Sequence, residues 1–133
     1  MARVLVVDDD PMVCVAIELC LQRQGFDVTV ADGAEAGVLA LKAAPFDVML
    51  IDIFMPKMRG YESIRIFHER APGVPLIAMS GYAFANLATP THEFLAMSLQ
   101  YGATRYLRKP FTPGSLLAVI TDCLLNPSRA VRP

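Results

Sequence analysis

The sequence has few of the residues that cross-link a small protein or bind transition metals. Three of its 133 residues are cysteines, and they form no Cys-x-x-Cys pair and have no histidine nearby. This spacing argues against a disulfide framework and against a cysteine metal site. We therefore expect Cys14, Cys20 and Cys123 to be small, buried hydrophobic residues in a reducing cytoplasm.

Long apolar runs and a strong charge imbalance are also absent. No apolar run approaches the ~18 residues needed to cross a membrane. The stretch Val4–Val7 is too short to be the core of a signal peptide. Twelve basic and thirteen acidic residues give a net charge of −1, which leaves no basic footprint for nucleic acid. We expect a cytoplasmic protein that binds neither membrane nor nucleic acid.

Hydrophobic residues, by contrast, are plentiful. They make up 54% of the chain, far more than a disordered segment carries. A length of 133 residues suits one domain with a real core and is short for two. We expect one domain over residues 1–125 and a short polar tail over 126–133.

Segments typical of strands alternate with segments typical of helices along the whole chain. The strands are apolar and often β-branched, and are expected at residues 3–7, 26–31, 47–51, 76–79 and 104–107. The helices begin after capping residues or turns, and are expected at residues 11–24, 34–43, 59–70, 90–101 and 113–125. This alternation predicts an α/β fold with one doubly wound, five-stranded parallel sheet and helices on both faces.

Charged residues stand at the ends of three predicted strands. Asp8 and Asp9 close the first strand, Asp52 closes the third, and Lys109 follows the last. Because the carboxyl ends of parallel strands open into one crevice, these side chains should gather at one site. Carboxylates ~4 Å apart repel each other by about 4 kcal/mol per pair at an effective dielectric of about 20. A bound cation relieves that repulsion, and oxygen ligands without cysteine or histidine favour Mg²⁺.

Other polar residues at this predicted rim have simpler interpretations when each is taken alone. Asp10 precedes Pro11 and is expected to cap the first helix. Ser80 resembles an ordinary turn residue, and Lys109 an ordinary surface lysine. Beside the acids, however, they offer a hydroxyl and a counter-charge for a phosphoryl group. The combination suits a phosphoryl group bound next to a divalent cation.

Four motifs, taken together, resemble the receiver domain of two-component response regulators. They are VVDDD at 6–10, DVMLIDIFMPKMRG at 47–60, LIAMSG at 76–81 and GATRYLRKPF at 102–111. Each motif is weak alone, but the four occur in the order and spacing of that family. The resemblance covers about residues 3–125 and implies a flavodoxin-like (βα)5 fold that works as a phosphorylation switch.

The resemblance also implies roles for the residues of the acidic site. Asp52 matches the aspartate that receives a phosphoryl group from a histidine kinase or a histidine phosphotransfer protein. Asp8, Asp9, Asp52 and the backbone carbonyl of Phe54 match the ligands of a Mg²⁺ ion.

Three further residues match the parts of the family that respond to the phosphoryl group. Ser80 matches the hydroxyl that hydrogen-bonds the phosphoryl group, and Lys109 matches the lysine that pairs with it. Tyr106 matches the aromatic switch that moves between outward and inward rotamers. An alternative is that Tyr106 is only a core aromatic on a strand, and both interpretations stay open here.

The chain departs from the family pattern at two aromatic residues and in one segment. Phe54 and Tyr82 flank the expected phosphoryl position, where they should restrict the attacking water and lengthen the phosphoryl lifetime. Residues 81–93 are longer than the usual connection. They are either an extension of the following helix or a partner-binding surface coupled to Ser80.

The leading functional hypothesis is a stand-alone response regulator that catalyses only its own phosphorylation and dephosphorylation. Its signal should leave through the face formed by residues 90–101, 104–107 and 113–125, toward a downstream protein or a second copy in a homodimer. One alternative is a Mg²⁺-dependent phosphohydrolase of the haloacid dehalogenase type, because Asp8 and Asp10 form its D-x-D spacing, although Met12 departs from its motif. The other alternative is a receiver-like interaction module that is never phosphorylated.

Overall fold

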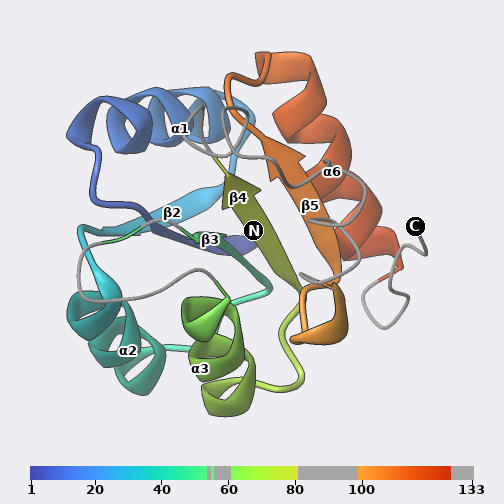
Figure 1. Cartoon of the computed structure of the whole chain (residues 1–133). Helices are drawn as coiled ribbons and strands as arrows, with labels where there is room; N and C mark the ends of the chain where they lie inside the picture. Colours follow the sequence, from blue (N-terminus) through green and yellow to red (C-terminus); the bar gives the residue numbers. More distant parts are fainter. Residues whose placement is uncertain (54, 56–60, 81–98, 127–133) are drawn as a thin grey trace.

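The computed structural model of the chain describes residues 1–53, 55, 61–80 and 99–126. Five parallel strands form a single sheet with the spatial order β2-β1-β3-β4-β5 (Figure 1). The strands are β1 (Arg3–Val7), β2 (Asp27–Ala31), β3 (Val48–Asp52), β4 (Leu76–Ser80) and β5 (Arg105–Arg108). The predicted fold class is confirmed, and every predicted strand exists within one residue of its expected ends.

Four helices of the described part of the chain cover the two faces of the sheet. They are α1 (Pro11–Arg23), α2 (Ala34–Ala43), α3 (Glu62–Arg70) and α6 (Pro113–Leu125). Helices α1 and α6 pack on one face, and α2 and α3 on the other (Figure 1). The predicted helix over residues 90–101 lies mostly outside the described residues. Within the described part of the chain, no helix is long and apolar enough to cross a membrane.

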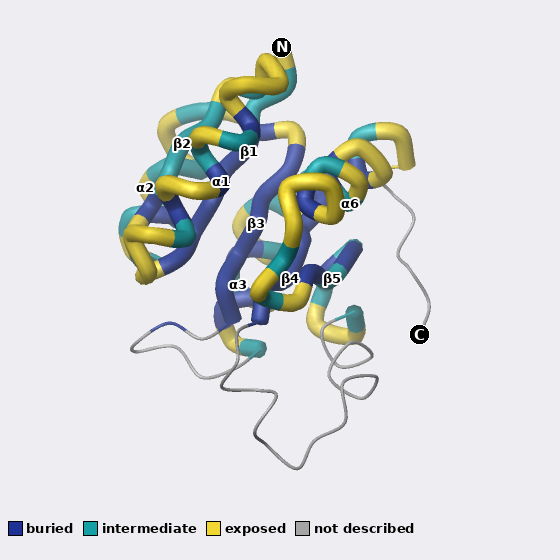
Figure 2. Tube along the Cα trace, turned by 90° about the horizontal axis from the view of Figure 1, so that it is seen from above, coloured by how far each residue is buried: buried dark blue, intermediate teal, exposed yellow. Residues whose placement is uncertain are grey.

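The inner strands β1 (from Val4), β3 and β4 are buried on both faces, which is what a parallel sheet between two helical layers requires. Val4 and Val6 of β1 point toward α1 and α6, whereas Leu5 and Val7 point toward α2 and α3. All residues of β3 and β4 are buried (Figure 2). The carboxyl ends of these central strands are therefore held by the most tightly packed part of the molecule.

The helix starts follow the capping chemistry expected from the sequence. Asp10 caps α1, because its Oδ1 accepts a hydrogen bond from the Met12 N–H at 2.9 Å. Thr112 caps α6 in a reciprocal capping box with Ser115. Gly25 follows α1 with φ of +88°, a left-handed conformation that suits glycine.

Two strand ends differ slightly from the prediction, and the difference matters for the site. Asp52 and Ser80 are the last residues of β3 and β4 and not the first residues of the loops. Their backbones are fixed by the ladder, where Asp52 pairs with Met79. Helix α3 begins at Glu62, with Tyr61 as its N-cap residue, whereas the expected helix began at Arg59; residues 59 and 60 lie outside the described part.

Candidate functional site at the carboxyl rim of the sheet

Three carboxylates meet at the carboxyl ends of the two central strands. β1 and β3 are parallel neighbours with Val7 opposite Ile51, so the next residues, Asp8 and Asp52, lie side by side. Carboxylate oxygens of Asp8, Asp9 and Asp52 all lie within 4.8 Å of one another. Asp8 is 1% exposed and Asp52 is 3% exposed, whereas Asp9 is exposed. The cluster is therefore sunk into the rim and opens to solvent at Asp9.

Lys109 supplies the positive charge that approaches this cluster. Its Nζ lies 2.5 Å from Asp8 Oδ2 and 3.7 Å from Asp52 Oδ2. The backbone N–H of Lys109 donates to the carbonyl oxygen of Ser80 at 2.7 Å, which fixes the end of β5 against β4. Among the described residues of the site, three acids face one lysine, so the cluster keeps an excess of negative charge that suits a cation.

Each of the two buried acidic residues accepts a hydrogen bond from a neighbouring element. Asp8 Oδ1 accepts from the Asp10 N–H at 2.9 Å. The hydroxyl of Ser63, in the first turn of α3, donates to the Asp52 carbonyl oxygen at 3.4 Å. This bond joins α3 to the backbone of the candidate phosphoacceptor, and it is shielded from water because Ser63 is fully buried. Sequence reasoning missed Ser63, since a serine inside a helix gives no sign of a partner eleven residues earlier.

The donor atoms of the cluster suit a hard divalent cation. The described cluster that could hold a metal contains only carboxylates. The nearby Cys14 thiol donates instead to the Asp8 carbonyl oxygen at 3.2 Å. Burial, and then the charge of Asp8, raise the pKa of Cys14 to about 11, so the thiol stays neutral and is a poor ligand for a soft metal. Oxygen donors alone, with one side open to water, fit Mg²⁺.

Ser80 and Tyr106 meet beside the acidic cluster. Ser80 is buried at the end of β4, and Tyr106 is half-buried on the neighbouring strand β5. The Tyr106 hydroxyl makes a close hydrogen-bonding contact with Ser80 Oγ. The aromatic ring packs against the core on the α2 and α3 face. The two residues that the sequence named as response elements therefore touch each other.

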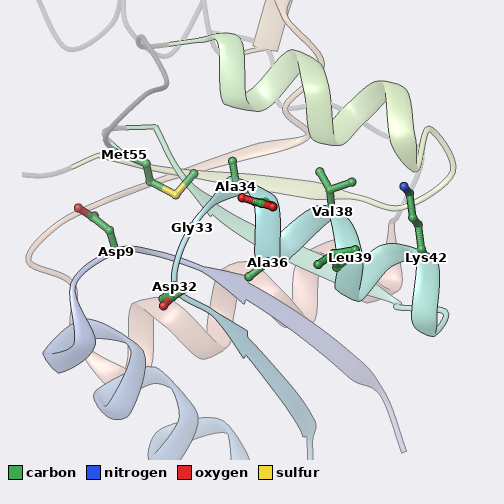
Figure 3. A pocket seen from close by; sticks show the side chains of 10 residues that line it. Asp9, Asp32, Gly33, Ala34, Ala36, Val38, Leu39, Lys42 and Met55 are labelled. Atoms are coloured by element: carbon green, nitrogen blue, oxygen red, sulfur yellow. The ribbon is translucent and has the colours of Figure 1, made fainter.

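An open groove of about 840 Å³ adjoins the exposed side of the cluster. Asp9 and Met55 line one end, and the groove follows α2 from Ala34 to Lys42 (Figure 3). The structure thus gives the acidic cluster a route to the surface on the α2 side.

The structure brings together most of the predicted site and leaves part of it outside the described residues. Asp8, Asp9, Asp52 and Lys109 form one cluster, as the parallel topology required. Phe54, whose carbonyl was expected to bind the metal, and Tyr82 lie outside the described residues, as does the segment 81–93. The roles of all these residues in phosphoryl transfer remain predictions.

Comparisons with known proteins agree with this geometry. The family profile described as the response regulator receiver domain matches residues 4–121. The cell cycle response regulator CtrA of Brucella ovis is 33% identical over 118 residues, which cover 89% of this chain and 48% of that protein. The chain thus spans about half the length of the curated relatives it matches.

Solved structures show the same fold. The CheY-like receiver domain protein of Methanospirillum hungatei JF-1 has a TM-score of 0.81 and 31% identity, covering 93% of this chain and 94% of that one. The receiver domain of the Francisella response regulator 1452 has a TM-score of 0.81 and 26% identity, covering 96% of this chain and 100% of that one. The chain belongs to the response regulator receiver domain family.

Proposed function

We propose that this chain accepts a phosphoryl group on Asp52 from the phosphohistidine of a histidine kinase or a histidine phosphotransfer protein. The observation that carries the proposal is the position of Lys109 Nζ between the buried carboxylates of Asp8 and Asp52. A lysine placed there can leave Asp8 and pair with a phosphoryl oxygen once the phosphoryl group is bound to Asp52.

The transfer would be an in-line displacement at phosphorus. An Asp52 carboxylate oxygen attacks the phosphorus and forms a P–O bond, giving an acyl phosphate. The P–N bond to the donor histidine breaks, its electron pair returns to the imidazole nitrogen, and that nitrogen takes up a proton. Lys109 then neutralises charge on the transferred oxygens, which is the main contribution that a protein makes to phosphoryl transfer.

Asp8, Asp9 and Asp52 would hold the Mg²⁺ ion, together with the Phe54 carbonyl if the family pattern applies here. When bound, the ion relieves the repulsion among the acids and neutralises charge on the phosphoryl oxygens. Asp8 and Asp52 are buried, the Asp8 carboxylate accepts a hydrogen bond from the Asp10 N–H, and the Asp52 backbone carbonyl accepts one from Ser63, so both residues would bind the ion with little rearrangement.

The exposed face of α1 supports docking of a protein donor next to Asp52. Met12, Val15 and Leu19 are 77%, 53% and 52% exposed, although they are large apolar residues spaced to share one side of the helix. A groove of about 450 Å³ runs beside them, between the start of α1 and the residues from Lys109 to Phe111. A helix of the donor could cover this apolar surface while its histidine reaches the acidic rim.

Ser80 and Tyr106 would carry the response. When Tyr106 donates its hydroxyl hydrogen to Ser80 Oγ, the Ser80 hydrogen remains available for a phosphoryl oxygen. The face that includes β5 and α6 would then change for a downstream protein or for a second copy of the chain. We place this activity in the cytoplasm, which the three free cysteines support.

Phe54 and Tyr82 remain proposed modulators of the phosphoryl lifetime. Replacing both with small polar residues should admit the attacking water and accelerate dephosphorylation. The measurement is the decay of the phosphorylated protein after the donor is removed, and an unchanged rate would reject this part of the proposal.

Mass spectrometry after incubation with acetyl phosphate and Mg²⁺ tests the main proposal. The wild type should gain one phosphoryl group, and Asp52→Asn should gain none. Asp122→Asn, which removes one carboxylate far from the rim in the fold, is the matched control and should behave as the wild type. No mass gain by the wild type would favour the unphosphorylated module. Turnover of general phosphate esters that requires Asp8 would favour the hydrolase.

A further inference from the structure

Two tyrosines that are 40 positions apart in the sequence stack face to face beside α3. The ring centroids of Tyr61 and Tyr101 are 5.3 Å apart, and their planes differ by 7°. Tyr61 lies directly before α3, and Tyr101 lies in the turn that leads to β5. The sequence patterns of the family motifs do not include this pair, so the known function of the fold leaves it unexplained.

Tyr61 also connects this stack to the response residues. Tyr61 and Tyr106 both pack against the core cluster on the α2 and α3 face. Burial raises the pKa of Tyr61 to about 12, with further contributions from the nearby Tyr106 and Tyr101. Tyr61 therefore stacks on Tyr101 and shares a core cluster with Tyr106, which in turn contacts Ser80.

A second contact ties the same helix to the same turn. Gly102 has φ of +117°, and a Cβ atom at this position would lie 2.5 Å from Cγ of His68, in the last turn of α3. The turn before β5 is thus packed against α3 at both ends of the helix, by Tyr101 on Tyr61 and by Gly102 on His68. α3 and this turn are therefore joined at two points.

The first turn of α3 also touches the phosphoacceptor strand. Ser63, two residues after Tyr61, donates its hydroxyl hydrogen to the Asp52 carbonyl oxygen. The rim is therefore connected to the surroundings of Tyr61 on two sides. Asp52 bonds to Ser63, two residues along the chain from Tyr61, and Ser80 contacts Tyr106, which packs against the same core cluster as Tyr61. From Tyr61 a single stacked ring leads on to Tyr101.

We propose that the Tyr61–Tyr101 stack is a positioning link that couples the Asp52 and Ser80 rim to the turn before β5. This inference rests on the proposed phosphorylation of Asp52. The structure contains both the stack and the contact between Tyr106 and Ser80. When Tyr106 is the donor in that contact, the Ser80 hydroxyl hydrogen can bond to a phosphoryl oxygen. Removing the stack should therefore weaken the state that binds a phosphoryl group, although neither tyrosine touches that group.

The test uses beryllofluoride with Mg²⁺, a mimic of the bound phosphoryl group, and calorimetric titration of the affinity. Tyr61→Leu and Tyr101→Ala should each weaken binding of the mimic by about three- to tenfold, the range expected for loss of an aromatic pair. The double variant should be no weaker than the worse single variant, because both changes remove one link. Tyr61→Phe and Tyr101→Phe keep the rings and should stay within about twofold of the wild type.

Two controls separate the link from a general loss of structure. Leu39→Ala removes another exposed apolar side chain, on α2, and should leave the affinity unchanged. The interaction energy between Tyr61 and Tyr101 is obtained from a double-mutant cycle of urea unfolding, once without and once with the mimic. If the stack is a link, this energy should be larger with the mimic bound. An equal energy in both conditions would mean that the stack is a purely structural contact. Tyr101 is 40% exposed, so Tyr101→Ala should fold even if Tyr61→Leu does not.

The outcomes distinguish this inference from the proposed function. If the wild type fails to bind the mimic, phosphorylation at Asp52 itself is rejected. If the wild type binds it and Tyr61→Leu and Tyr101→Ala bind equally well, the link is rejected and the proposed function stands.

Discussion

Two ion pairs at opposite ends of β5 show how differently this fold uses buried charge. At the carboxyl end, Lys109 approaches both Asp8 and Asp52, and a third acid lies beside them. At the amino end, Arg105 Nε lies 2.7 Å from Asp122 Oδ2 of α6. The Arg105 side chain is 6% exposed, and it also donates to the carbonyl oxygen of Thr104.

The difference lies in charge balance. Arg105 and Asp122 form a neutral pair that joins β5 to α6, and a buried arginine requires such a partner. Lys109 cannot neutralise three acids, so the rim is left with an unfavourable excess of negative charge that a cation and a phosphoryl group would resolve. The balanced charges of Arg105 and Asp122 join two elements of the fold, whereas the unbalanced charges of the rim lie at the proposed site of chemistry.

Lys109→Ala should give the largest effect on activity. Lys109 is the side chain proposed to neutralise the transferred oxygens, so without it the rate of phosphorylation by acetyl phosphate should fall about a hundredfold. The rate is followed by the time course of the mass gain. Arg105→Ala should keep a rate near that of the wild type, and an equal loss in both variants would contradict the comparison.

Arg105→Ala should instead give the largest effect on stability. It leaves a cavity under α6 and removes the partner of Asp122, and we expect a loss of about 2–3 kcal/mol in the free energy of unfolding. Urea denaturation measures it. A variant as stable as the wild type would show that the pair contributes little, as happens where desolvation offsets the attraction.

Removing one acid from each pair should change stability in opposite directions. In the presence of EDTA, Asp52→Asn should raise the free energy of unfolding by about 1–2 kcal/mol, because it relieves repulsion in the buried cluster. Asp122→Asn should lower it by about 0.5–1 kcal/mol, since this carboxylate is half-exposed and screened. The same sign in both variants would contradict the idea of an unbalanced rim.

A small, pH-dependent effect concerns the thiol beside the structural pair. Burial raises the pKa of Cys123 from its ordinary value of 9.0 to about 11, with Asp122 raising it and Arg105 opposing that. The folded state thus favours the neutral thiol: this stabilisation is complete below pH 9 and is lost as the pH rises through about 11. When the pH is raised from 8 to 10, the free energy of unfolding of the wild type should fall by about 1 kcal/mol more than that of Cys123→Ala. Urea unfolding at the two pH values measures the difference.

The sequence was sufficient to predict the sheet and the acidic rim. Apolar runs defined five strands, and the parallel topology required Asp8, Asp52 and Lys109 to share one edge. The ends of the strands moved by a residue, because the ladder continues through Asp52 and Ser80 until hydrogen-bonding partners run out.

Contacts between distant side chains could not be predicted in the same way. The Tyr61–Tyr101 stack depends on how α3 is rotated against the turn before β5, which no local pattern encodes. Arg105 did leave a signal: strand alternation puts it on the same face as Leu107, which packs under α6. A buried arginine there calls for an acid, and Asp122 is the only acidic residue of α6.

The central position of β1 and β3 has a consequence for how such a protein can be altered. Asp8 and Asp52 stand at the ends of strands whose apolar side chains are buried on both faces of the sheet. A change in the position of either acid would therefore disturb the hydrophobic core. β5 is an edge strand in the strand order, and its residues Tyr106 and Arg108 are half-exposed and exposed. In the proposed function, the exposed part of β5 can therefore vary with the partner, whereas the two buried acids and Lys109, which follows β5, must keep their positions.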